Sequence, residues 1–164
     1  MRNHDQVISE QFGSTAAAYL TSAVHAQGAD LQDLTAYAQQ YAEAIILDMG
    51  CGGGHASFAV APHARQVIAY DLSADMLDVV RQAAAERKLE NIETRQGSAD
   101  SLPFADAMFD MVCTRFSAHH WRHLPQALAE AARVLKPGGR FIVIDTAAPA
   151  DVLADTYMQA IELL

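Results

Sequence analysis

The sequence has few basic side chains and no long apolar run. Eleven Lys and Arg stand against twenty Asp and Glu, which gives a formal charge of -9 over 164 residues. Tight binding to nucleic-acid phosphates or to an anionic membrane depends on clustered basic side chains, so neither is an expected partner. Apolar stretches such as residues 45–47 and 141–144 are far shorter than the roughly 18 residues that span a bilayer, so no membrane insertion is expected. Small molecules and proteins remain as partners.

Cysteine is scarce as well. Cys51 and Cys113 are the only two, and neither they nor the histidines show the spacing of metal ligands. We therefore predict no metal site. The first residues, with Arg2, Asp5 and Glu10 and no apolar run, do not have the pattern of a signal peptide. Both observations favour a reduced, cytoplasmic compartment.

The first 43 residues predict a helical segment ahead of the main domain. Apolar residues recur at spacings of three and four in its second half, at Leu31, Leu34, Ala38 and Tyr41. This spacing marks one face of a helix, and a further short helix is expected around residues 12–20. We assign residues 1–43 to an N-terminal helical lead-in or lid and residues 44–164 to the main domain.

Beyond residue 43 the sequence alternates between short apolar runs and longer amphipathic segments. Five runs predict strands, over residues 44–49, 66–71, 92–96, 109–114 and 140–145. Helices are predicted near residues 55–61, 74–88 and 125–135, the last ended by the Pro-Gly-Gly of residues 137–139. Helices between continuously apolar strands are typical of a parallel sheet covered on both faces. The fold class is therefore a doubly wound α/β fold with a mostly parallel, Rossmann-like sheet, which binds ligands at the carboxyl ends of its strands.

The first predicted strand runs into a loop with four glycines among residues 50–54. Such a loop lets a ligand approach the main chain closely. The dinucleotide pattern G-x-G-x-x-G does not fit, because neither possible start leads to a third glycine. The spacing is instead D-x-G-x-G-x-G from Asp48, and a carboxylate beside the loop suits a ligand with an ammonium group rather than a pyrophosphate.

The second predicted strand ends in another acid, Asp71. A carboxylate at this place can accept two hydrogen bonds from a ribose diol. The alternative is an N-cap for the following helix, a role that Ser73 fills equally well.

Three segments together resemble the class I S-adenosylmethionine-dependent methyltransferases: residues 46–54, Asp71 and residues 133–139 (Arg-Val-Leu-Lys-Pro-Gly-Gly). The nearest subgroup is similar to the ubiquinone and menaquinone biosynthesis C-methyltransferases. The resemblance implies S-adenosylmethionine as cofactor and methyl transfer to a small-molecule acceptor, quinone-like or another carbon or oxygen nucleophile. Family sheets normally have seven strands, so it also implies a C-terminally truncated domain that lacks the last two.

The resemblance also implies roles for single residues. The methionine end of the cofactor would lie against the lead-in and the glycine loop, at Tyr19, Asp48, Gly50, Cys51, Gly52 and Gly54. Asp71 would bind the ribose hydroxyls and Leu72 would lie on the adenine face. Residues 97–104 correspond to the family's G-D-A-x-x-L-P-F, in which the acid accepts from the adenine amino group; Ser98 replaces that acid, and Ala99 supplies the backbone N–H. Arg115 is expected to hold the cofactor carboxylate or an anionic substrate, or else to form a surface ion pair.

Two adjacent histidines, His119 and His120, are the best acid or base candidates, because imidazole titrates near neutrality. Adjacent residues point in different directions, so one of them at most is expected to face the substrate, and a packing or capping role is the alternative. Methyl transfer needs alignment rather than a nucleophilic side chain. Cys51 is accordingly interpreted as a small spacer and not as a thiolate.

Other functions are less compatible with the sequence. The N/D-P-P-Y/F element of nucleic-acid amino methylases is absent after the fourth predicted strand, and the glycine spacing disfavours a nicotinamide dehydrogenase. A protein that binds S-adenosylmethionine without catalysis stays as the alternative. An unpaired apolar edge at residues 141–144 also predicts a homodimer through the fifth strand.

Overall fold

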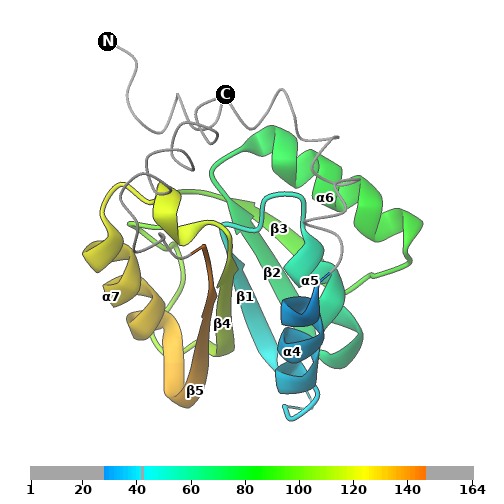
Figure 1. Cartoon of the computed structure of the whole chain (residues 1–164), viewed down its shortest axis with the longest axis horizontal. Helices are drawn as coiled ribbons and strands as arrows, with labels where there is room; N and C mark the ends of the chain where they lie inside the picture. The colour runs from blue at the N-terminus through cyan, green and yellow to red at the C-terminus, as the bar shows by residue number, and fades with distance from the viewer. Residues whose placement is uncertain (1–27, 42, 147–164) are drawn as a thin grey trace, which may run out of the picture.

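The structure is a computed structural model and describes residues 28–41 and 43–146 (Figure 1). The helix expected around residues 12–20 and Tyr19 lie outside the described residues, as does the chain beyond residue 146. Within the described part, no helix has the length and apolar character needed to cross a membrane.

A five-stranded parallel sheet forms the centre, with the strand order β3-β2-β1-β4-β5. Its strands are β1 (Ile45–Met49), β2 (Gln66–Asp71), β3 (Ile92–Gln96), β4 (Phe109–Arg115) and β5 (Leu135–Ile144). The chain moves outward from β1 to β3 and then returns to place β4 on the other side of β1. The direction of winding therefore changes between β1 and β4, where a doubly wound fold binds its ligand. The predicted fold class is confirmed.

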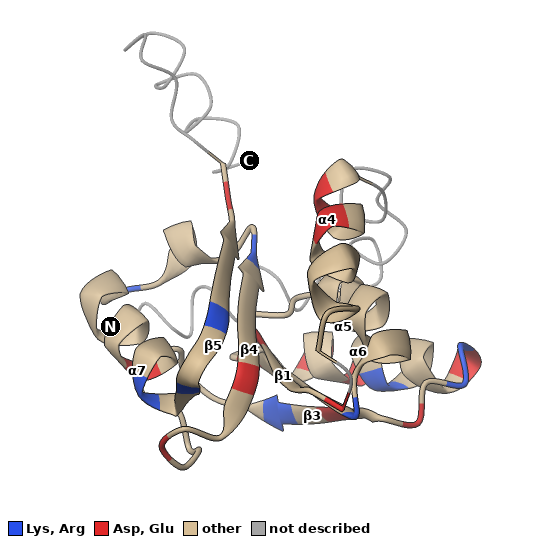
Figure 2. Ribbon diagram, turned by 90° about the horizontal axis from the view of Figure 1, so that it is seen from below, with Lys and Arg blue, Asp and Glu red and all other residues tan. Residues whose placement is uncertain are grey.

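Helices cover both faces of this sheet (Figures 1 and 2). They are α4 (Ala29–Ala38), α5 (His55–Val60), α6 (Ala74–Glu86) and α7 (Leu124–Val134), with short 3-10 turns η1 (Ala61–His63) and η2 (Ala118–His120). Helices α4, α5 and α6 lie on one face and α7 lies on the other. Strand β1 shows why: Ile46 packs with Leu34 of α4, while the next residue, Leu47, packs with Ala131 of α7. A strand with both faces buried is apolar throughout.

The largest departure from the sequence prediction is at β5. Helix α7 ends at Val134, and β5 begins at the next residue, so residues 137–139 lie inside the strand and do not end the helix. The physical reason is that Leu135 already pairs with Phe109, across a register shift that precedes Met111. Such an irregularity accommodates a proline that a regular ladder would exclude.

Candidate cofactor and catalytic site

The glycine loop after β1 takes a backbone form that favours glycine. Gly50, Gly52 and Gly54 have φ angles of 74°, 49° and 82°, in the left-handed region that costs other residues free energy. The N–H groups of Gly50 and Cys51 both donate to the carbonyl oxygen of Tyr70, at 2.8 and 3.0 Å. The loop is thereby folded over the carboxyl end of β2.

Two of these glycines have different surroundings. A Cβ atom at Gly50 would overlap the side chain of Ser117, which follows β4 and accepts a hydrogen bond from Trp121 Nε1 at 3.1 Å. A Cβ atom at Gly52 would meet no atom within 4 Å. Gly50 is therefore required for packing against the turn after β4, whereas Gly52 borders open space that a ligand can occupy.

Asp48 lies in the interior at the end of β1, with an exposed fraction of 1%. Its Oδ2 accepts a hydrogen bond from Ser57 Oγ of α5 at 2.6 Å. Burial raises the pKa of Asp48 to about 6, more than the hydrogen bond from Ser57 lowers it. Asp48 thus ties β1 to α5, and its contact with a methionine moiety stays a prediction.

Asp71 joins the glycine loop to the start of α6. Its Oδ2 accepts from the N–H of Gly52 at 2.8 Å, and its Oδ1 accepts from the N–H of Ser73 at 2.9 Å. Burial raises the pKa of this carboxyl group. Ser73 itself caps α6, because its hydroxyl accepts from the N–H of Met76. A carboxylate has about four acceptor positions, so Asp71 keeps acceptor capacity for a diol after both backbone bonds.

The predicted adenine segment lies beside Asp71. The N–H of Gly97 donates to the Asp71 carbonyl oxygen at 3.0 Å, and Tyr70 Oη donates to the Ser98 carbonyl oxygen at 3.1 Å. Ser98 and Ala99 are half-buried, as is Leu72. The structure therefore brings together the residues predicted for ribose and adenine.

A clamp formed by Arg133 and Glu130, which the sequence did not predict, holds the second half of this segment on α7. The Arg133 guanidinium donates to both carboxylate oxygens of Glu130, at 2.7 and 2.8 Å. It also donates to the carbonyl oxygens of Leu102 and Phe104, at 3.0 and 2.8 Å. The hydrogen bond from Arg133 lowers the pKa of Glu130 to about 2. Arg133 was expected only as part of a motif. Its spacing of three residues from Glu130 was a local signal for the ion pair, whereas the carbonyl groups of Leu102 and Phe104 left none.

Arg115 forms an ion pair with Asp30 of α4, and the Arg115 side chain is only 6% exposed. Its guanidinium also lies 4.4 Å from the centre of the Phe116 ring. The hydrogen bond from Arg115 lowers the pKa of Asp30. The ion pair that the sequence allowed is present, but it is largely buried and connects α4 to the end of β4.

His119 and His120 form η2, and their ring centres are 3.9 Å apart. His119 Nδ1 lies 2.6 Å from Oδ1 of Asp145, the residue after β5. Asp145 was not predicted as a site residue. A usable signal was its place at the end of the fifth predicted strand, because the carboxyl ends of parallel strands meet at one edge of the sheet.

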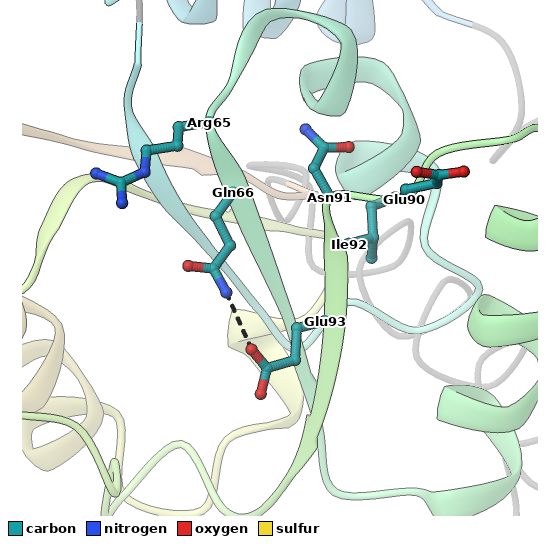
Figure 3. A pocket seen from close by; sticks show the side chains of 6 residues that line it. All are labelled: Arg65, Gln66, Glu90, Asn91, Ile92 and Glu93. Atoms are coloured by element: carbon teal, nitrogen blue, oxygen red, sulfur yellow. Dashed lines mark hydrogen bonds between the residues drawn. The ribbon is translucent and has the colours of Figure 1, made fainter.

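Neither the cysteine thiols nor the pocket in Figure 3 adds a reactive group to this site. Burial raises the pKa of Cys51 well above its usual range, which opposes a thiolate at neutral pH. Within residues 28–41 and 43–146, no group of three or more His, Cys, Asp or Glu is arranged to hold a metal ion. A cavity of about 390 Å³ is lined by Arg65, Gln66, Glu90, Asn91, Ile92 and Glu93 (Figure 3). It lies at the amino ends of β2 and β3, at the opposite edge of the sheet from the glycine loop.

Known proteins similar to this chain include methyltransferases and an uncharacterized relative. A family described as a methyltransferase domain matches residues 47–143. The uncharacterized protein YafE of Escherichia coli (strain K12) is 53% identical over 115 residues, which are 70% of this chain and 56% of YafE. The ubiquinone/menaquinone biosynthesis C-methyltransferase UbiE of Zymomonas mobilis is 35% identical over 113 residues, which are 69% of this chain and 47% of UbiE.

The same fold is present in a solved structure. The crystal structure of YcgJ from Bacillus subtilis matches with a TM-score of 0.74 and 37% identity, over 80% of this chain and 56% of that chain. This chain thus spans about half the length of the relatives that it matches.

Proposed function

Because this chain belongs to the S-adenosylmethionine-dependent methyltransferase family, we propose that it transfers the methyl group of that cofactor to a small molecule. The observation that carries the proposal is the setting of Asp71. Its carboxylate is held by the N–H groups of Gly52 and Ser73 and retains acceptor capacity, beside the open space at Gly52. This arrangement fits a ribose diol.

Each part of the site has a proposed task toward the cofactor. Asp71 binds the two ribose hydroxyls, Leu72 lies on one adenine face, and Ser98 and the Ala99 N–H bind the adenine edge. The loop of residues 50–54 surrounds the methionine end, over the buried carboxylate of Asp48. For Arg115, the buried pair with Asp30 supports an anchoring role for α4 rather than direct contact with the cofactor carboxylate.

The bound cofactor supplies a methyl group on a positively charged sulfur, and this chain supplies alignment and exclusion of water. No nucleophilic side chain is required, in agreement with the raised pKa of Cys51. The turn of residues 117–121 packs on Gly50 through Ser117, and this contact supports a place for His119 and His120, in the same turn, near the methionine end. In the proposal, one of these imidazoles takes a proton from the acceptor.

The acceptor is proposed to be quinone-like or another molecule with an acidic O–H or C–H group. Support comes from the similarity to the named UbiE enzyme and from the acidic charge of the chain, which suits a small ligand better than a polyanion. A cytoplasmic location belongs to the same proposal. Both cysteines are free and buried, as in a reduced compartment.

A homodimer through β5 is part of the proposal as well. This strand forms one edge of the described sheet, and Val143 on it is 49% exposed. An unpaired apolar edge favours association. Sedimentation at micromolar concentration tests it, since a monomer mass would contradict a dimer.

The proposed site is tested by calorimetry with S-adenosylhomocysteine. The variant Asp71→Ala should lose measurable binding and keep the circular dichroism spectrum of the parent chain. Asp78→Ala is the matched control, because Asp78 lies on α6 with its side chain 63% exposed. Unchanged affinity in Asp71→Ala would remove the ribose assignment.

Catalysis is tested separately with S-adenosylmethionine that carries a labelled methyl group. Incubation with a cell extract should transfer label to a small metabolite, which mass spectrometry then identifies. Binding of the cofactor without any transfer would instead support the binding protein without catalysis.

A further inference from the structure

Tyr70, the second-last residue of β2, is connected to all three parts of the proposed cofactor site. Its backbone carbonyl oxygen accepts from the N–H groups of Gly50 and Cys51 in the glycine loop, at 2.8 and 3.0 Å. The residue that follows it is Asp71, the proposed ribose ligand. Its side chain is buried, and its hydroxyl group reaches the chain beyond β3, the neighbouring strand (Figure 1). The loop, the ribose ligand and the adenine segment (residues 97–104) are therefore linked through one residue.

The hydroxyl group of Tyr70 lies against two main-chain carbonyl groups of the adenine segment. Tyr70 Oη is 3.1 Å from the Ser98 carbonyl oxygen and 3.4 Å from the Ser101 carbonyl oxygen. Burial raises the pKa of Tyr70 to about 12, so the hydroxyl group stays protonated and its O–H donates to these oxygens. Removal of the O–H would deprive both carbonyl groups of a donor, at a cost in free energy. The hydroxyl group thus holds the segment against β2.

The close approach of the Tyr70 ring depends on Gly97, the first residue of the adenine segment. A Cβ atom at Gly97 would overlap Tyr70 Oη and would lie 2.7 Å from Cζ of the same ring. A larger residue at this position would therefore push the segment and the ring apart. The N–H of Gly97 also donates to the Asp71 carbonyl oxygen at 3.0 Å. Gly97 and Tyr70 together fix the distance between the segment and β2.

The turn of residues 98–101 keeps its own shape through two local hydrogen bonds. The N–H of Ser101 donates to the Ser98 carbonyl oxygen at 3.2 Å, and the N–H of Asp100 donates to Ser98 Oγ at 3.4 Å. The proposed adenine ligands, Ser98 and the Ala99 N–H, both belong to this turn. Because the turn has its own hydrogen bonds, it is expected to move as a unit. Its distance from β2 then decides where both groups meet the base.

We propose that Tyr70 is a positioning residue for adenine: its hydroxyl group holds the turn of residues 98–101 where Ser98 and the Ala99 N–H meet the edge of the base. This inference rests on the proposed function. A hydrogen bond to a neutral serine is weaker than one to a carboxylate, so the placement of the main-chain N–H matters more at this site. The choice of adenine as the base then depends on a buried side chain as well as on the two groups that contact it.

The inference is tested by calorimetry with two ligands that differ in the base. S-adenosylhomocysteine carries adenine, whereas S-ribosylhomocysteine has the same ribose and amino acid without a base. Tyr70→Phe removes the hydroxyl group and keeps the ring, so its affinity for S-adenosylhomocysteine should fall about tenfold, the scale of one hydrogen bond. Its affinity for S-ribosylhomocysteine, measured by displacement, should equal that of the parent chain.

Tyr41→Phe is the matched control, because the Tyr41 hydroxyl group also makes a hydrogen bond, from Arg140 Nε at 3.1 Å, but Tyr41 belongs to the turn before β1. This control should bind both ligands as the parent chain does. Gly97→Ala presses on the same contact from the other side. It should repeat the selective loss, which keeps the inference testable if Tyr70→Phe does not fold. Unchanged affinity of either variant for S-adenosylhomocysteine, or an equal loss for both ligands, overturns the inference.

Hydrogen–deuterium exchange of the full chain without ligand tests the hold on the turn separately from the proposed function. In Tyr70→Phe, peptides that cover residues 97–104 should exchange about tenfold faster than in the parent chain, because a hydrogen bond that closes the segment is lost. Peptides that cover residues 50–54 should exchange at the parental rate, because the main chain of residue 70 is unchanged. Equal exchange of residues 97–104 in both chains overturns the inference.

The two experiments separate this inference from the proposed function. If the parent chain binds neither ligand, the proposed function fails and the role of Tyr70 toward adenine fails with it. The exchange rates then still decide whether the hydroxyl group holds the turn. If the parent chain binds S-adenosylhomocysteine and the Tyr70→Phe variant binds it equally well, the inference alone fails.

Discussion

Replacement of Asp48 by Asn should make the folded chain more stable at neutral pH. Asp48 is 1% exposed, and burial raises its pKa from the usual 3.8 to about 6. Between these two pH values the folded chain binds more protons at this site than the unfolded chain does. The contribution of Asp48 to the free energy of unfolding therefore falls as the pH rises through this window.

The size of the effect follows from the shift. A difference of about 2 pH units at 1.36 kcal/mol per unit corresponds to about 3 kcal/mol between the acidic and the neutral limits. Asparagine has nearly the same shape, keeps an oxygen that accepts from Ser57, and carries no charge. We expect Asp48→Asn to exceed the parent chain by up to about 3 kcal/mol above pH 6 and to match it near pH 4.

Urea unfolding at several pH values between about 4 and 8 measures this difference, and the other titrating groups cancel because both chains share them. The exposed Asp78→Asn is the control and should give a difference from the parent chain that is small at every pH. Parallel stability curves for Asp48→Asn and the parent chain would refute the argument, because they would show that the Asp48 carboxylate is not destabilised by burial.

Three further substitutions test other parts of the site. Gly52→Ala should lower the free energy of unfolding by only about 1 kcal/mol, because its φ of 49° disfavours alanine but a Cβ atom meets nothing within 4 Å. The same variant should weaken binding of S-adenosylhomocysteine in calorimetry more than tenfold. Unchanged affinity would place the ligand elsewhere. Thr114 is 1% exposed, and its hydroxyl has no hydrogen-bond partner among the described residues, so Thr114→Val should raise the free energy of unfolding in urea by about 1 kcal/mol. A decrease would reveal a partner for that hydroxyl. Arg133→Ala removes the hydrogen bonds to two loop carbonyl groups and should lower both the midpoint of thermal unfolding and the cofactor affinity. A lower midpoint with unchanged affinity would show that the clamp contributes to stability but not to cofactor binding.

Features that depend on local sequence were predictable. The bounds of β2 and β3 agree with the prediction, because apolar runs between turn residues mark buried strands. The glycine loop was predictable for the same reason, since its backbone form depends on its own residues. The start of β5 was not predictable from local sequence. It depends on the pairing of Leu135 with Phe109 across a register shift, which is a contact between residues far apart in the chain.

Contacts between distant residues account for what was missed in the site. Asp145 lies 26 residues from His119, Asp30 lies 85 residues from Arg115, and Arg133 holds a carbonyl group 31 residues away. None of these pairs leaves a periodic pattern in the sequence. The fold class alone limits which residues can contact one another, because the carboxyl ends of all the strands lie at one edge of the sheet. The strand order then decides which of these ends are neighbours.

The strand order also explains why chemically equal acids behave differently at this edge of the sheet. Asp48 is the second-last residue of the central strand β1 and is enclosed between the covering layers, so its charge acts on stability. Asp145 follows the edge strand β5 and keeps 15% of its side chain exposed, and its carboxylate contacts the His119 imidazole. The same change of Asp to Asn should therefore alter the pH dependence of unfolding at the first position and the histidine tautomer at the second. If the two variants showed the same phenotype, depth in the sheet would not be what separates their roles.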